Sequence, residues 1–294
     1  MVMAKQLSDV MKDKNKADSI DELIKNCNQA SKQISESDPF ICLGCKRKVT
    51  EITFESGYKF KYNCHCEAIK MGKKAQAKNE YIKHSRYFDA SLKYIPQQYH
   101  FVTFDQVNST DPSVERAKRI SERYVNSFSK NNPQSLYFYG GFGLGKTMLS
   151  ACIMNALKNS YKVMFIDVSM LLNDFKLAWN KDSELAKSNY TEKMMMYIRT
   201  ADLVIFDDIG AEQGLKTDKS MLNNLVNSRM QKHSIFTSNL KNTELAKDTD
   251  YERIFSRMME RCTPVAFAGV DQRRKDKFSK EVYQPAYDLS NPPF

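Results

Sequence analysis

The segment from Gly140 to Thr147 has the composition and spacing of a loop that binds phosphate groups. It reads Gly-Gly-Phe-Gly-Leu-Gly-Lys-Thr and directly follows an apolar run that ends at Tyr139. Glycines let the backbone curl until successive N–H groups face a phosphate, and a helix that begins at the end of the loop adds its partial positive charge. The residues expected to contact a nucleotide are Gly140, Gly141, Phe142, Gly143, Leu144, Gly145, Lys146 and Thr147.

The last two residues of this loop indicate which ligand it binds. We expect the Lys146 ammonium to bridge the β- and γ-phosphates and the Thr147 hydroxyl to ligate Mg²⁺. A strand over residues 135–139 and a helix over residues 147–158 provide the context that such a loop needs. The sequence therefore predicts a site for ATP with Mg²⁺.

Two carboxylates follow the apolar run Leu203–Phe206. We expect Asp207, at the end of a buried strand, to lie in the Mg²⁺ shell, where the cation stabilises its charge. Asp208 is the candidate base that orients the attacking water. The alternative role for Asp208 is to cap the turn that follows. Because Asp is shorter than the Glu often found at this position, we expect an ATPase with slow, regulated hydrolysis.

A third polar residue, Asn239, follows a short strand predicted over residues 234–237. If that strand lies beside the strand ending at Asp207, the Asn239 amide can reach the γ-phosphate or the attacking water. The alternative is that Asn239 is an N-cap or turn residue before residues 243–246. We include Asn239 in the catalytic set with Lys146, Asp207 and Asp208.

Four of the seven cysteines cluster between Cys42 and Cys66. Cys42 and Cys45 form one pair, and Cys64 and Cys66 form a second, tighter pair. Two such pairs supply the four soft ligands that tetrahedral Zn²⁺ requires. His65 could replace Cys64 or Cys66, and unligated buried thiols are the alternative. Since a four-ligand site has no open position, we expect a structural zinc without a catalytic role.

The N-terminal part of the chain predicts elements unlike those that follow. Residues 1–38 have helix-like apolar spacing, and residues 50–54 and 58–62 alternate around Ser56-Gly57 as in a β-hairpin. Residues 70–93 are basic and predict a helical connector.

From residue 94 onward, short apolar strands alternate with helices, which implies parallel βαβ units. Besides the segments already named, strands are predicted over residues 162–167 and 203–207, and helices over residues 169–179 and 191–199. We therefore expect an α/β domain with a parallel sheet. The predicted domains are a helical and zinc-binding domain over 1–67, a basic connector over 68–93 and the α/β domain over 94–294.

The composition, 41% apolar and 27% charged over 294 residues, fits a folded protein with two domains. No run of about 18 apolar residues occurs, and Lys5 and Asp9 stand where a signal peptide needs an apolar stretch. We therefore expect a cytoplasmic protein. The formal net charge of +10 favours nucleic acid, an anionic membrane or an acidic protein surface as a partner. Charge alone does not choose among them.

In this order and spacing, the motifs resemble the bacterial helicase-loader family of DnaC and DnaI. These are AAA+ ATPases related to the transposition helper IstB and the initiator DnaA. The resemblance covers roughly Tyr94 to Lys277. Its most specific parts are Asp-Asp-Ile-Gly-Ala-Glu from Asp207, Phe-Thr-Ser-Asn ending at Asn239, and Glu-Arg-x-x-x-Arg-Met from Glu252. The resemblance implies an AAA+ P-loop ATPase core.

By this resemblance Arg257 matches the arginine finger, which reaches the γ-phosphate held by a neighbouring subunit, and Arg253 is the next candidate. Arg274, or its neighbour Arg273, matches the second sensor arginine, which acts within its own subunit. A guanidinium suits both roles because it stays charged and offers a planar fork of donors. The alternative is that these arginines form surface salt bridges.

The resemblance also implies partners. It predicts a loader that docks on a hexameric DnaB-type helicase through its zinc-bearing N-terminal domain and delivers it onto single-stranded DNA during replication initiation. Self-association through the ATPase domain is implied, and no membrane partner. An IstB-like transposition helper is the alternative function, and a P-loop small-molecule kinase is a more distant one. Phe175, Lys176 and Trp179 either face DNA or belong to a helix packed on the core.

Overall fold

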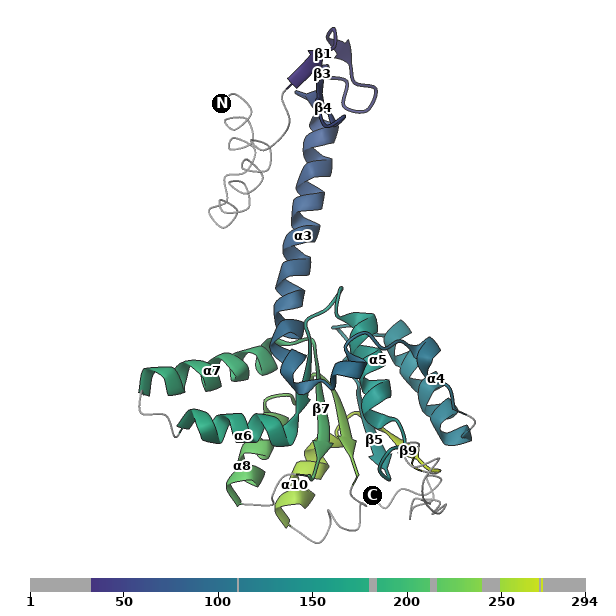
Figure 1. Ribbon diagram of the computed structural model, residues 1–294, viewed down its shortest axis with the longest axis vertical. Helices are drawn as coiled ribbons and strands as arrows, with labels where there is room; N and C mark the ends of the chain where they lie inside the picture. The colour runs from purple at the N-terminus through teal and green to yellow at the C-terminus, as the bar shows by residue number, and fades with distance from the viewer. Residues whose placement is uncertain are drawn as a thin grey trace. The chain divides into compact units, whose positions relative to one another are not determined.

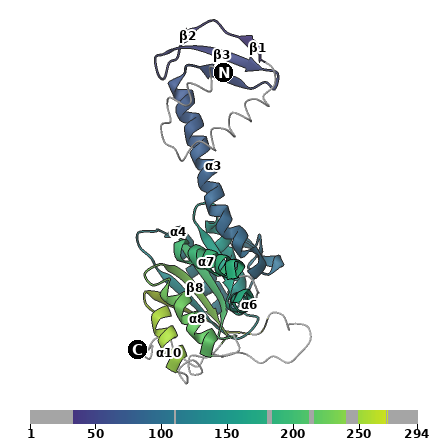
Figure 2. The same ribbon diagram turned by 90° about the vertical axis from the view of Figure 1, so that its left-hand side faces the viewer.

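The computed structural model describes residues 33–109, 111–179, 184–211, 216–239, 249–269 and 271 (Figures 1 and 2). The chain divides into two compact units, Met1–Glu80 and Tyr81–Phe294. Helix α3 (His65–Ser91) contains the division and occupies most of the segment in which a helical connector was expected. Most of the stretch where N-terminal helices were expected, residues 1–32, lies outside the described residues.

The first unit contains a small antiparallel sheet. Strand β3 pairs with each of the other three strands, and Figure 2 shows β1, β2 and β3 side by side. The strands are β1 (Gln33–Glu36), β2 (Phe40–Ile41), β3 (Lys48–Phe54) and β4 (Lys59–Tyr62). The β3–β4 hairpin confirms the prediction, and its turn contains Gly57 at φ 77°. The helical expectation is wrong for residues 33–36, because β3 offers this segment a backbone ladder that local apolar spacing cannot reveal.

The core of the first unit is very small. Among the described residues it consists of Cys42, Val49 and Cys64, with Cys45 packed against them. A sheet of this size buries too little apolar surface to be stable by packing alone, so small domains of this kind depend on metals or disulfides. The described part of this unit therefore depends for its stability on what holds its cysteines together.

The second unit is built on a five-stranded parallel sheet with the order β6-β7-β8-β5-β9. Its strands are β5 (Ser135–Gly140), β6 (Val163–Asp167), β7 (Leu203–Ile209), β8 (His233–Ser238) and β9 (Cys262–Phe267). The first four strands and their parallel arrangement confirm the predictions. Because parallel strands point the same way, the residues that end β5, β7 and β8 meet at one edge of the sheet.

Helices cover both sides of this sheet. They are α4 (Pro112–Asn126), α5 (Lys146–Leu157), α6 (Val168–Trp179), α7 (Glu184–Thr200), α8 (Lys216–Asn227) and α10 (Thr249–Met258). Short 3₁₀ turns η2 (Leu92–Tyr94), η3 (Gln97–Tyr99) and η4 (Phe104–Gln106) lead into the unit. Helix α4 packs on α5, while α8 packs on α6 and α10, and Figure 1 shows the two groups on opposite sides of the strands. No helix in the described part of the chain is both long and apolar enough to span a membrane.

The core of the second unit lies between the sheet and these helices. Its largest fully buried side chains include Tyr137, Phe138, Phe165, Phe206 and Phe267, all from strands. Packing of this kind fixes the strand ends, and thus the polar residues that follow them, in one geometry.

Candidate nucleotide-binding site and cysteine cluster

The predicted phosphate loop joins strand β5, which lies between β8 and β9, to helix α5. A Cβ on Gly140, which has φ 146°, would lie 2.2 Å from the carbonyl oxygen of Phe267, so only glycine lets the end of β9 approach the loop this closely. Gly145 has φ 92° and directly precedes the first residue of α5. Phe142 is 66% exposed, whereas Leu144 is buried in the core. Leu144 can therefore contact a nucleotide only through its backbone.

Lys146 is buried at the base of the loop. Its Nζ donates to the carbonyl oxygens of Gly140 at 2.8 Å and Gly141 at 2.7 Å, and to Oδ1 of Asn239 at 2.7 Å. The structure thus brings Asn239, at the end of β8, to the lysine of the phosphate loop. An ammonium in this position can meet the phosphates of a nucleotide cradled by the loop.

Asp207, in β7, lies beside the first turn of α5. The Thr147 hydroxyl lies 3.0 and 3.2 Å from the two carboxylate oxygens of Asp207, and the Thr237 hydroxyl donates to Oδ1 at 2.7 Å. Burial raises the pKa of Asp207 to about 6, although the hydrogen bonds from both hydroxyls oppose that shift. A buried carboxylate beside a hydroxyl is a pair of hard oxygen donors, which fits Mg²⁺.

Asp208 has the left-handed backbone conformation, with φ 60°. Its N–H donates to the Thr237 hydroxyl at 2.8 Å, and its carboxylate accepts from the Asn239 side-chain amide. The side chain of Asp208 therefore belongs to the same cluster as Lys146 and Asn239. Lys146, Asn239 and Asp208 form one hydrogen-bonded chain, and Thr147, Asp207 and Thr237 form another next to it.

Sequence reasoning missed two members of this edge, Thr237 and Asp167. Asp167 ends β6 opposite Asp207 in the sheet and accepts a hydrogen bond from the N–H of Met170 at 2.8 Å, which caps helix α6. Asp167 could have been found from the sequence, because it directly ends a predicted strand. Thr237 could not, because a threonine within an apolar strand is ordinary strand composition.

Arg257 lies far from this edge. It lies in the last turn of helix α10, donates to the Asn223 side chain of α8, and lines a pocket with Ser135 and Ser234. Those serines stand where β5 and β8 begin, so Arg257 lies at the opposite end of the strands from Gly140 and Asn239. Within one chain it does not reach the candidate nucleotide site.

Arg273 and Arg274 lie outside the described residues. Asp271, shortly before them, is described: a Cβ on Gly143 would lie 1.6 Å from Asp271 Oδ1. Asp271, two residues before Arg273, therefore lies beside the phosphate loop.

Helix α6 carries the three residues considered as possible DNA contacts, and their environments differ. Phe175 is buried in the core, and Lys176 is paired with the buried Asp218 at 2.7 Å. Trp179 is 49% exposed. Phe175 thus serves packing, and Trp179 is the one of the three whose ring is open to solvent.

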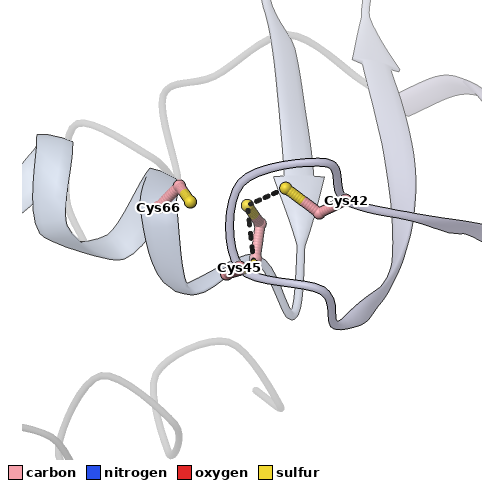
Figure 3. Close-up of side chains that lie close together, drawn as sticks. Cys42, Cys45 and Cys66 are labelled. Atoms are coloured by element: carbon pink, nitrogen blue, oxygen red, sulfur yellow. Dashed lines mark hydrogen bonds between the residues drawn. The ribbon is translucent and has the colours of Figure 1, made fainter.

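The four clustered cysteines lie close together, and Figure 3 shows three of them, Cys42, Cys45 and Cys66. Their sulfur atoms all lie within 4.8 Å of one another, with Cys42 and Cys64 at 3.6 Å and Cys45 and Cys64 at 3.9 Å. A tetrahedral zinc with Zn–S bonds of about 2.3 Å separates its sulfurs by about 3.8 Å, so this geometry fits Zn²⁺. His65 is not part of the cluster.

The environments of these thiols differ. A backbone hydrogen bond from Arg47 is the main cause that lowers the pKa of Cys45 to about 6, whereas burial is the main cause that raises the pKa of Cys66 to about 11. Gly44 leaves room for Cys66, because a Cβ there would lie 2.8 Å from the Cys66 sulfur. The sequence Cys-x-Gly-Cys is therefore suited to closing the cluster.

A parallel sheet with a phosphate loop after β5, two carboxylates near the end of β7 and an amide residue directly after β8 defines a P-loop ATPase fold of the AAA+ type. The chain belongs to the family described as "IstB-like ATP binding protein", whose model matches residues 74–279. This confirms the resemblance found in the sequence. The matched region begins after the cysteine cluster, so the cluster lies outside what the family shares.

Two curated relatives are replicative helicase loaders. DnaI of Bacillus subtilis (strain 168) is 26% identical over 196 residues, which is 61% of this chain and 61% of DnaI. DnaC of Buchnera aphidicola subsp. Baizongia pistaciae (strain Bp) is 25% identical over 190 residues, covering 62% of this chain and 72% of DnaC. The match thus spans about three fifths of the length of DnaI.

A crystal structure of DnaI has a similar fold. It superimposes with a TM-score of 0.51 at 24% identity and covers 61% of this chain and 95% of that chain. This similarity supports the fold assignment of the second unit.

Proposed function

We propose that this protein is an ATP-dependent loader, which binds a hexameric DnaB-type replicative helicase and delivers it onto single-stranded DNA at the start of replication. The observation that carries the ATPase part is the polar edge where Lys146, Asn239 and Asp208 meet beside Thr147 and Asp207. The names of the B. subtilis and Buchnera relatives support the loading role. Such a role places the protein in the cytoplasm.

In this proposal each residue of the edge has a task in ATP hydrolysis. The loop and Lys146 hold the phosphates, and the Thr147 hydroxyl and the Asp207 carboxylate hold Mg²⁺, which neutralises developing phosphate charge. Asp208 orients the attacking water, and Asn239 contacts that water or the γ-phosphate. The Lys146–Asn239–Asp208 chain supports these assignments, since it joins the phosphate side of the site to the water side.

The two candidate arginines act on the γ-phosphate from different subunits. Arg257 serves as the arginine finger of a neighbouring copy, and its distance from the nucleotide edge of its own chain supports a role in trans. Arg274, or Arg273, acts in cis, which is supported by the contact of Asp271 with the phosphate loop. The proposal therefore requires self-association through the ATPase domain.

Residues 1–67 form the docking module for the helicase, and Zn²⁺ bound by Cys42, Cys45, Cys64 and Cys66 holds that module together. Its position outside the family-wide region supports a specialised role. The basic charge of the chain supports contact with single-stranded DNA, made by the ATPase domain.

Light scattering of the full-length protein mixed with the replicative helicase of the same host tests the proposal. We expect a complex larger than the helicase hexamer, and ATP-dependent transfer of helicase onto circular single-stranded DNA. Lys146→Ala is the control: it should form the complex but fail in transfer. Absence of any complex, in a preparation that hydrolyses ATP, would favour the transposition helper instead.

A further inference from the structure

The pairing of β7 and β8 contains an irregularity at the catalytic edge. The register runs without a break from Leu203 opposite His233 to Phe206 opposite Phe236, and resumes with Ile209 opposite Ser238. Between these pairs, Asp207 and Asp208 face the single residue Thr237. An extra residue of this kind is a β-bulge, which interrupts the backbone ladder and redirects the side chains next to it.

The side chain of Thr237 forms hydrogen bonds where the backbone ladder between β7 and β8 is interrupted. Its hydroxyl oxygen accepts the N–H of Asp208 at 2.8 Å, and the hydroxyl donates to Oδ1 of Asp207 at 2.7 Å. Thr237 is 2% exposed. Because a hydroxyl has one proton, and the Asp208 N–H must be the donor in its own bond, the proton of Thr237 is directed to Asp207.

We infer that Thr237 is a positioning residue, whose single hydroxyl fixes the orientation of both carboxylates of the site, those of Asp207 and Asp208. By donating to Asp207 Oδ1, it fixes the carboxylate plane that also meets the Thr147 hydroxyl. By accepting from the Asp208 N–H, it holds that residue at φ 60°, a conformation that is unfavourable for a residue with a side chain. That conformation carries the Asp208 carboxylate to Asn239.

This inference rests on the proposed ATPase function. It predicts that the loss of one hydroxyl impairs both Mg²⁺-dependent ATP binding and ATP hydrolysis. Losing the hydroxyl frees the Asp207 carboxylate to rotate and leaves the Asp208 N–H without its acceptor. Loss of an outer partner of a metal ligand typically reduces metal affinity or activity by about 10–100-fold. Phosphate contacts made by the loop and Lys146 do not pass through Thr237, so nucleotide binding without Mg²⁺ should survive.

The test compares Thr237→Val, which keeps the shape and loses the hydroxyl, with Thr237→Ser, which keeps the hydroxyl and loses the methyl group. In the full-length protein we expect Thr237→Val to lower kcat by about 10–100-fold and to weaken ATP binding in the presence of Mg²⁺, with binding in EDTA unchanged. Thr237→Ser should restore both properties to near the parent values. ATP affinity with and without Mg²⁺ is measured by calorimetric titration, which does not depend on turnover.

Ser238→Ala is the matched control, because the buried Ser238 hydroxyl also joins β8 to β7, donating to the backbone carbonyl of Ile209 at 2.7 Å. It should lower the melting temperature without changing the effect of Mg²⁺ on affinity. If Thr237→Val does not fold, Thr237→Ala is judged by the same two measurements.

The inference is overturned if Thr237→Val keeps the parent kcat and Mg²⁺ dependence, or if Thr237→Ser is as impaired as Thr237→Val. A parent protein that hydrolyses ATP yet loads no helicase would overturn the proposed loading function alone. A parent that does not bind ATP would overturn both.

Discussion

Asp207 shows how burial and function oppose each other at a single residue. Its carboxylate is 6% exposed, and its resolved partners are two hydroxyls, from Thr147 and Thr237. Desolvation of the charged form is the largest influence and raises its pKa to about 6. A divalent cation would relieve that penalty, so the residue proposed to bind Mg²⁺ is also one that makes the metal-free protein less stable near neutral pH.

The free energy of unfolding should depend on pH because of the buried Asp207 carboxylate. A carboxyl group whose pKa is raised on folding, here from 3.8 to about 6, contributes stability below pH 4 that is lost as the pH rises through 6. We expect the free energy of unfolding of the parent, minus that of Asp207→Asn, to fall by on the order of 2–3 kcal/mol between pH 4 and pH 7. Urea unfolding in the presence of a magnesium chelator measures it. Parallel pH profiles for the two proteins would contradict the assignment.

At this scale the sequence predicted the polar edge well. Lys146 and Thr147 begin the helix after β5, Asp207 lies near the end of β7, and Asn239 directly follows β8. They converge because the ends of neighbouring parallel strands meet at one edge of the sheet. Thr237 was not predictable, since its role depends on a bulge that exists only when β7 and β8 pair. The remoteness of Arg257 from its own site was likewise invisible, because it depends on where α10 ends.

Among the elements, α7 is tied to the sheet by a buried arginine. Arg229 donates to the carbonyl oxygens of Ile198 and Ala201, at the end of α7, and to that of His233, at the start of β8. Burial lowers the pKa of Arg229 to about 10. The guanidinium thus supplies donors to helix carbonyls that have no partner within the helix.

Arg229→Met, which replaces the guanidinium with an apolar chain of similar length, should lower the free energy of unfolding by about 2–4 kcal/mol, because several buried carbonyls lose a charged donor. Arg229→Lys should recover only part of that loss, since one ammonium cannot span the same acceptors. The measurement is the midpoint of urea unfolding at pH 7. A loss below about 1 kcal/mol for Arg229→Met would show that water replaces the guanidinium.

The elements missed by sequence reasoning have identifiable causes. Strand β9 contains Pro264, which argues against a strand unless it lies at an edge, and β9 is the last strand of its sheet. Helices α4, α8 and α10 carry mostly polar residues, and α4 is identified mainly by its Asp111 N-cap followed by Pro112. The predicted strands, by contrast, are continuous apolar runs, as expected for a sheet covered on both faces.

At the scale of the whole molecule, the two units differ in what stabilises them. The second has an extensive apolar core, whereas the core of the first includes the thiols of Cys42 and Cys64. Removing the proposed zinc should therefore unfold the first unit and leave the second intact.

Treating the full-length protein with a strong zinc chelator tests this separation. We expect new proteolytic cleavage within residues 33–64 and unchanged ATP affinity, measured with a fluorescent nucleotide analogue. Cys45→Ser should behave as the chelated protein does, and Cys152→Ser, a change at a buried thiol of α5, should keep its zinc. Loss of ATP binding on chelation would contradict the independence of the two sites.

Assembly of several copies provides a second prediction at this scale. Arg257→Ala should bind ATP nearly as tightly as the parent and hydrolyse it at least about 100-fold more slowly, by comparison with arginine fingers elsewhere. Mixing it with Lys146→Ala should restore part of the activity, because one interface then combines an intact loop with an intact Arg257. A mixture that co-assembles but shows no recovery at any ratio would mean that Arg257 has a structural role.

The order of strands also constrains how the protein is made. Strand β5 lies between β8 and β9, both of which follow it in the chain, so a ribosome releases β5 long before either neighbour is synthesised. Until then its two apolar, unpaired edges can recruit other nascent chains. The carbonyl oxygen of Phe267 lies against Gly140, so the phosphate loop is completed only when β9 emerges. Translation products that stop before Cys262 are therefore expected to be insoluble rather than partly active, and chaperone demand should peak late in synthesis.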